Sequence, residues 1–126
     1  MTGQAPEALA IAVLVVSADR NFQRFARAVL RQGGHTVYVT GTRCADVAVQ
    51  LRLRDPHVVV LDLDHPDVDC MRRVLDRVAV VEVSDEPAAT AQRAGGKWEG
   101  APALVAAVER EANAVRRRGR LRLVTS

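Results

Sequence analysis

The residues best placed for chemistry lie in one stretch at the centre of the chain, from Pro56 to Cys70. Its first half, Val58 to Leu61, is a wholly apolar run of mostly β-branched residues, which is typical of a strand buried on both faces of a parallel sheet. Asp62 ends this run, and polar and turn-forming residues follow it. Open α/β sheets place their sites at the carboxyl ends of such strands. Asp62 is therefore the first candidate for a functional carboxylate.

Three further extended segments surround this central strand in the prediction. Residues 11–16 are a second continuous apolar run, residues 36–40 form a shorter strand at a sheet edge, and residues 78–83 form a fourth strand. Apolar residues at helical spacing follow each of the first three strands. This alternation predicts a flavodoxin-like, doubly wound parallel sheet with the strand order 2-1-3-4-5 and helices on both faces.

Capping residues indicate where the helices of the first half begin and end. The first helix is expected to start near Asp19 or Asn21 and to stop at the glycine pair 33–34. The second helix ends at Asp55, which precedes a proline. The third helix is short, and Asp69 is its expected N-cap.

The residue pattern in the second half of the chain predicts a shortened fourth helix and a shortened fifth strand. Pro87 suits the first turn of a fourth helix, which the glycine pair 95–96 stops after about two turns. Residues 97–100 are too few for a normal fifth strand. The longest helix is expected over residues 101–118, with Gly119 as its end.

The length of 126 residues corresponds to one domain. We expect a disordered leader at residues 1–9, a folded domain at residues 10–118, and a basic extended tail or edge strand at residues 119–126. The net charge of +3 is too small by itself to indicate a polyanionic partner. Residues 1–10 contain no Lys or Arg, and no apolar run approaches the roughly 20 residues of a membrane span. A cytoplasmic protein without a membrane span is therefore predicted.

Other kinds of site receive little support from the residues. Cys44 and Cys70 have no metal-binding spacing and are expected to be reduced, although a disulfide between them stays open, and Cys70 is expected to act as a small packing residue. His35, His57 and His65 lie far apart, which predicts surface or loop histidines and no metal site. The sequence has no glycine-rich nucleotide turn and no nucleophile–base pair. An enzyme is therefore not expected.

The first half of the sequence resembles the receiver domain of response regulators. The apolar strand that ends on Asp62 is similar to the strand that carries the phosphoacceptor aspartate of that family. Pro66, Val68 and Asp69 match residues that follow the acceptor, whereas Cys70 stands in place of a glycine. The resemblance implies a receiver fold, a role in signalling, and Asp62 at the phosphoacceptor position.

The residues that support phosphorylation in that family are replaced in this sequence. Receivers hold Mg²⁺ with an acidic pair after the first strand, with the acceptor and with a backbone carbonyl, and the pair positions here are Ser17 and Ala18. Asp19 and Asp64 are weak candidates to hold a metal together with Asp62. No metal or other cofactor is therefore expected, and Mg²⁺ would be required only if Asp62 accepts a phosphoryl group.

Two further positions correspond to functional residues of receivers. Ser84 falls at the switch position at the end of the fourth strand, and its alternative role is the N-cap of the following helix. Lys97 is the only lysine of the chain and the candidate phosphate-binding lysine. Trp98 follows it in place of the proline of the family, and the alternative role of Lys97 is a solvated loop residue.

The sequence thus predicts a degenerate receiver, or pseudo-receiver, that acts through a protein partner in a signalling pathway, independently of phosphorylation. A homodimer through the fourth helix, fifth strand and fifth helix, or through the C-terminal strand, is compatible with this hypothesis. One alternative is a two-component receiver phosphorylated on Asp62, and a second is a small-ligand sensor that uses the vacated acidic pocket. The C-terminal arginines suit a helix dipole and lack an aromatic platform, so nucleic-acid binding is not expected.

Overall fold

The computed structural model describes residues 11–40, 43–84, 95–96 and 100–125, and side chains as far as residue 115. Strands and helices alternate along the chain. The strands are β1 (Ala12–Val16), β2 (Thr36–Thr40), β3 (Val58–Asp62), β4 (Val80–Ser84) and β5 (Gly95–Gly96). The helices are α1 (Arg20–Gln32), α2 (Cys44–Arg54), α3 (Val68–Val74) and α4 (Ala101–Thr125).

All strand pairs are parallel, and the sheet has the order β2-β1-β3-β4-β5. The predicted doubly wound topology is confirmed for the four main strands. Of the fifth strand, the structure describes two residues, Gly95 and Gly96, which pair with Val83 and Ser84. The central pair β1 and β3 is in register from Val13 opposite Val58 onward, so the carboxyl ends of both strands lie at the same edge.

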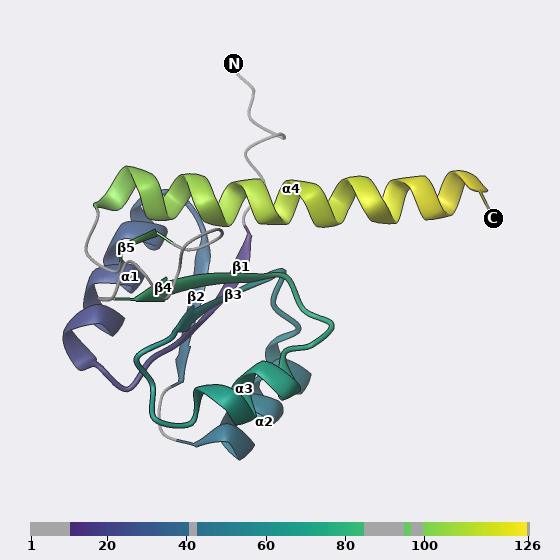
Figure 1. The fold of residues 1–126 in the computed structure, drawn as a ribbon. Coiled ribbons are helices and arrows are strands. Elements are labelled where there is room, and N and C mark those ends of the chain that lie inside the picture. Colours follow the sequence, from purple (N-terminus) through teal and green to yellow (C-terminus); the bar gives the residue numbers. More distant parts are fainter. Residues whose placement is uncertain (1–10, 41–42, 85–94, 97–99, 126) are drawn as a thin grey trace.

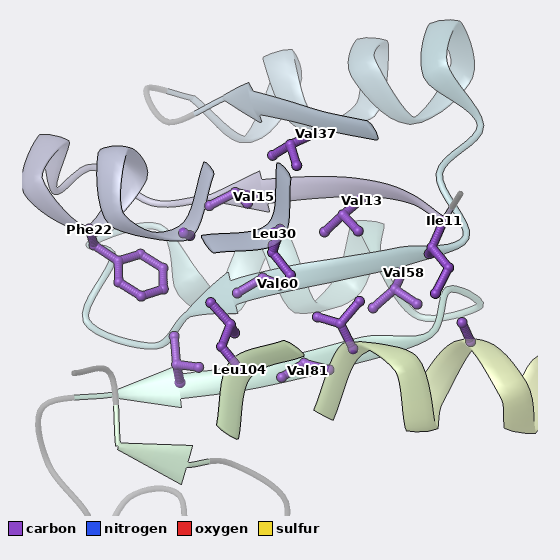
Figure 2. Packing of buried hydrophobic residues seen from close by; sticks show 14 residues of the cluster. Ile11, Val13, Val15, Phe22, Leu30, Val37, Val58, Val60, Val81 and Leu104 are labelled. Carbon is purple, nitrogen blue, oxygen red and sulfur yellow. The ribbon is translucent and has the colours of Figure 1, made fainter. Parts of the chain in front are cut away.

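In the described part of the chain, helices cover both faces of the sheet (Figure 1). Helices α1 and α4 pack on one face, and α2 and α3 pack on the other. Val58 and Val60 of β3 point into the first core, whereas Val59 and Leu61 point into the second. Figure 2 shows Val58 and Val60 among the side chains of the α1–α4 core. Because a strand alternates its side chains between two apolar layers, β3 has the continuous apolar sequence that identified it.

The ends of α1 agree with the sequence prediction. Asp19 is the N-cap, and its Oδ1 accepts hydrogen bonds from the backbone N–H groups of Asn21 (2.9 Å) and Phe22 (3.2 Å). Gly33 is the C-cap, and Gly34 has a φ of 90°, which favours glycine. The chain then turns directly into β2.

Two helix boundaries differ from the prediction. Helix α3 begins at Val68 with Asp67 at its N-cap, so Asp69 lies inside the first turn. A carboxylate in the first turn interacts favourably with the positive end of the helix dipole. For this reason both Asp67 and Asp69 are favourable near the start of the helix. Helix α4 continues past Gly119 to Thr125, and the expected extended tail is wrong. One glycine costs a helix only about 1 kcal/mol, and the arginine and leucine residues around it are good helix formers.

Several predictions fall on residues that the structure does not describe. The leader at residues 1–9, the fourth helix expected from Pro87 and the candidate Lys97 lie outside the described residues. For the part of the chain that is described, no helix is long and apolar enough to cross a lipid bilayer.

The charged residue within β4 has a partner, as its position in a largely apolar strand required. Glu82 Oε2 lies 3.4 Å from Nε of Arg72 on α3. The Glu82 side chain is 26% exposed to solvent, so the ion pair lies at the rim of the α2–α3 layer and not in its centre. Solvent access lowers the cost of placing a carboxylate on this strand.

Cys44 and Cys70 form a disulfide that joins the first turn of α2 to α3. The expectation of reduced cysteines is therefore wrong for this structure. The residues are 26 apart in sequence, but α2 and α3 lie side by side on the same face of the sheet. The disulfide links the two helices that cover the smaller of the two cores. The loop that it closes, residues 44–70, contains β3.

Reduction of this disulfide should lower the free energy of unfolding by about 2–4 kcal/mol, because the closed loop restricts the unfolded chain. Urea denaturation with and without dithiothreitol measures the change. The double variant Cys44→Ser, Cys70→Ser is the control and should be insensitive to the reductant. Equal stability of the oxidised and reduced wild type would contradict the prediction.

Replacement of Leu30 by alanine should destabilise the fold by about 2–5 kcal/mol, because Leu30 is completely buried between α1 and the sheet. Leu53→Ala is the matched control: this side chain is 68% exposed on α2, and its loss should change stability by less than about 0.5 kcal/mol. Urea midpoints with unchanged slopes provide the comparison. Similar shifts for the two variants would show that α1 does not pack as described.

Candidate functional site

The parallel sheet brings three of the sequence-predicted site residues to one edge. Asp62 is the last residue of β3, Ser17 directly follows β1, and Ser84 is the last residue of β4. All three are at most 2% exposed. Strands that run in the same direction end at the same side of the sheet, so residues distant in sequence meet there.

Both carboxylate oxygens of Asp62 accept hydrogen bonds. The Ser17 hydroxyl donates to Oδ2 at 2.6 Å, and the backbone N–H of Asp64 donates to Oδ1 at 2.9 Å. A buried carboxylate is costly unless such donors replace water. The side chain of Asp62 is thus held by one neighbouring strand end and by its own following turn.

Ser17 is itself fixed by its surroundings. Its Oγ accepts a hydrogen bond from the backbone N–H of Asp19 at 3.0 Å while donating to Asp62. Its backbone N–H donates to the carbonyl of Thr40, and its carbonyl accepts from Nε2 of Gln23. The hydroxyl therefore holds one orientation between the end of β1 and the end of β3.

The two neighbours of Ser17 in the sequence have other surroundings. Ala18 is exposed and carries only a methyl group. The Oδ1 of Asp19 caps α1, which is the structural role that the sequence also predicted for this residue. The position of the acidic pair is thus occupied by a hydrogen-bonded hydroxyl and a methyl group.

A second hydrogen bond extends the network to β4. The Ser84 hydroxyl donates to Oδ1 of Asp64 at 2.9 Å. Asp64 also donates its backbone N–H to Asp62, so it links the ends of β3 and β4. The helix that Ser84 was alternatively expected to cap lies outside the described residues. Ser17, Asp62, Asp64 and Ser84 together define the strand-end network.

His65 belongs to the same region and was not identified from the sequence. It is 3% exposed, and its Nδ1 accepts a hydrogen bond from the backbone N–H of Asp67 at 3.0 Å. An Nδ1 that accepts a hydrogen bond carries no proton, so the ring proton is on Nε2. His35 is also buried. Both histidines lie in loops, as expected, but neither is at the surface. No spacing or pattern in the sequence marks either of them.

The donor set does not fit a magnesium ion. Mg²⁺ demands near-ideal octahedral oxygen geometry and is held by one or two carboxylates together with waters and substrate phosphates. Within the described ranges, no group of three or more His, Cys, Asp or Glu side chains could hold a metal ion. The Ser17 hydroxyl donates its proton to Asp62 and adds no negative charge that would attract a metal ion.

Comparison with solved structures identifies the fold. The anti-anti-sigma factor PhyR from Bartonella quintana matches with a TM-score of 0.71 and 16% identity over 91% of this chain. NtrX from Brucella abortus matches with a TM-score of 0.77 and 17% identity over 92% of this chain. The signal receiver domain of NarL from Mycobacterium tuberculosis matches with a TM-score of 0.61 and 25% identity, over 82% of this chain and 97% of that domain.

These matches show that the chain has the α/β fold of a response-regulator receiver domain. The chain spans 52% of the PhyR chain and 29% of the NtrX chain, so it corresponds to one part of those proteins. No protein-family model matches the sequence, and no curated protein matches it.

Replacement of Ser17 by alanine should destabilise the fold by about 1–3 kcal/mol, because it removes a donor from a buried carboxylate. A double-mutant cycle with Asp62→Asn tests whether the cost belongs to this pair. The Ser17→Ala change should cost clearly less when Asp62 is already neutral. Additive effects in chemical denaturation would show that the two side chains do not interact.

Proposed function

We propose that this chain is a receiver-like signalling module that binds a protein partner without a phosphorylation switch. The observation that supports this most directly is the 2.6 Å hydrogen bond from Ser17 to Asp62. It holds the carboxylate at the phosphoacceptor position in a closed network. The receiver fold supplies the signalling context, and replacement of the acidic pair removes the usual carboxylate ligands of the metal.

Phosphoryl transfer to Asp62 would require two changes at the strand-end network. One carboxylate oxygen would have to leave its donor and become the nucleophile, and a cation would have to neutralise the phosphoryl oxygens. In the structure each oxygen accepts a hydrogen bond, and Asp62 is 2% exposed. The neutral hydroxyl of Ser17 cannot provide the charge of a carboxylate pair for binding Mg²⁺.

The partner surface that we propose is the face formed by β4, β5 and α4. In the described part of the chain, β5 pairs with Val83 and Ser84 at the end of β4. A groove of about 1240 Å³ lies between α3, β4 and α4, and Arg72, Glu82, Arg110 and Ala114 are among the residues that line it. Helix α4 projects beyond the sheet at its C-terminal end (Figure 1). The long final helix and the groove beside it support a changed partner at this face.

The proposal predicts that neither Mg²⁺ nor Mg²⁺ with beryllofluoride will perturb the backbone amide signals of Asp62, Asp64 and Ser84 in a folded sample. Beryllofluoride mimics an acyl phosphate, and its binding requires the metal and an accessible carboxylate oxygen. An amide NMR titration at millimolar metal measures the response. A pulse of acetyl phosphate followed by intact-mass measurement tests covalent labelling in the same sample.

The double variant Ser17→Asp, Ala18→Asp is the matched control, because it supplies the two missing carboxylates on the same fold. Signals that shift in this variant and not in the wild type would support the proposal. Mg²⁺-dependent shifts or labelling of the wild type that disappear in Asp62→Asn would overturn it and establish the phosphoacceptor alternative. Stabilisation by a small molecule in a thermal-shift screen, lost in Ser17→Ala, would instead favour the ligand-sensor alternative.

A further inference from the structure

The outer edge of the sheet at β2 carries a basic groove that the strand-end network does not use. Strand β2 is the first strand in the sheet order, and β1 pairs with one side of it. A groove of about 600 Å³ runs along the other side, between α1 and α2. Arg27 and Arg31 of α1 and Arg54 of α2 line it.

Among the residues that the structure describes, no strand pairs with the outer edge of β2, so its backbone presents pairing groups to this groove. The N–H of Thr36 donates to Ile11, and the carbonyl of Thr40 accepts from Ser17, so these residues direct their polar groups toward β1. Successive residues of a strand direct their N–H and C=O groups to opposite sides. The backbone groups of Val37 and Val39 therefore face outward, where another extended segment can pair with them.

The charged side chains that line the groove are all basic. Among the described residues that line it, three are arginines and none is Asp or Glu. Arg54 is positioned by its neighbours: its guanidinium lies 4.6 Å from the centre of the Tyr38 ring, and its Nε donates to Gln50 at 3.2 Å. All three arginines are exposed. Within the described ranges, the groove thus combines a strand edge that no other strand covers with cations on both flanking helices.

We propose that the β2 edge binds an acidic, extended peptide segment, which adds to the sheet as a sixth strand beside β2. Backbone hydrogen bonds to Val37 and Val39 provide the pairing, and the arginines select the charge. A second copy of the chain is the wrong occupant, because pairing two β2 edges would bring two sets of the same arginines together. This surface is separate from the proposed α4 face and does not depend on whether Asp62 accepts a phosphoryl group.

The probe is a short, acetylated and amidated peptide of alternating valine and glutamate, labelled for fluorescence anisotropy. Binding should slow hydrogen exchange at the amides of Val37 and Val39 and shift the NMR signals of β2. The same peptide with N-methylated valines retains the charge but loses strand pairing, and it should bind at least about tenfold more weakly. The lysine analogue should not bind.

Charge reversal tests the arginines. The triple variant Arg27→Glu, Arg31→Glu, Arg54→Glu should weaken peptide binding by about tenfold or more, since three ion pairs are replaced by repulsion. The matched control Arg20→Glu, Arg24→Glu, Arg52→Glu changes exposed residues of the same two helices by the same charge, outside the groove. It should retain most of the affinity.

Three results would overturn the proposal. Equal binding of the N-methylated peptide would show that no strand is added, and this comparison uses only the wild-type protein. An equal loss in both triple variants would show attraction to net charge alone. A single-stranded oligonucleotide that displaces the peptide and shifts the same β2 signals would assign the groove to nucleic acid.

Discussion

Burial of β3 on both faces is the constraint on which the rest of this structure depends. A central strand with four consecutive apolar residues must be covered twice, so the chain has to supply helices to both faces of the sheet. Parallel strands with right-handed crossovers meet that requirement, and they place the carboxyl ends of all strands at the same edge of the sheet. The location of Asp62 is therefore a consequence of core formation and not of its own interactions.

In the strand-end network, hydrogen-bond donors from neighbouring residues stabilise a buried carboxylate. A hydroxyl and a backbone amide donate to Asp62, and a second serine donates to Asp64. Hydrogen bonds to an ionised group are stronger than neutral ones, and several together compensate for the loss of water. Such an arrangement favours one fixed structure of the strand ends, which is what a binding module without a switch requires.

The β4 side and the β2 side of the sheet have different surroundings. At β4 the described part of the chain provides the β5 residues Gly95 and Gly96 and the long helix α4, whereas at β2 it places arginines on both flanking helices. Charged residues beside an exposed strand discourage association of identical edges. The same charges are attractive to an acidic chain, so protection against self-association and recognition of a partner are compatible at β2.

The sequence by itself determined the order of the strands, the double burial of β3, the cap of α1 at Asp19 and the strand-end position of Asp62. These features follow from local patterns: apolar runs, helical spacing and capping residues. The length of α4 was not predictable in this way, because a single glycine is a weak stop signal when strong helix formers surround it.

Only the tertiary structure decided which distant side chains meet. Cys44 and Cys70 form a disulfide because α2 and α3 share one face of the sheet. Ser17 donates to Asp62 because β1 and β3 are adjacent and in register. His35 is buried because it lies between the start of β1 and α4: its Nδ1 accepts from Ile11 at 3.3 Å, and its Nε2 lies 2.9 Å from Glu109. Each pairing depends on the packing of elements far apart in the chain, and no local pattern of residue types contains that information.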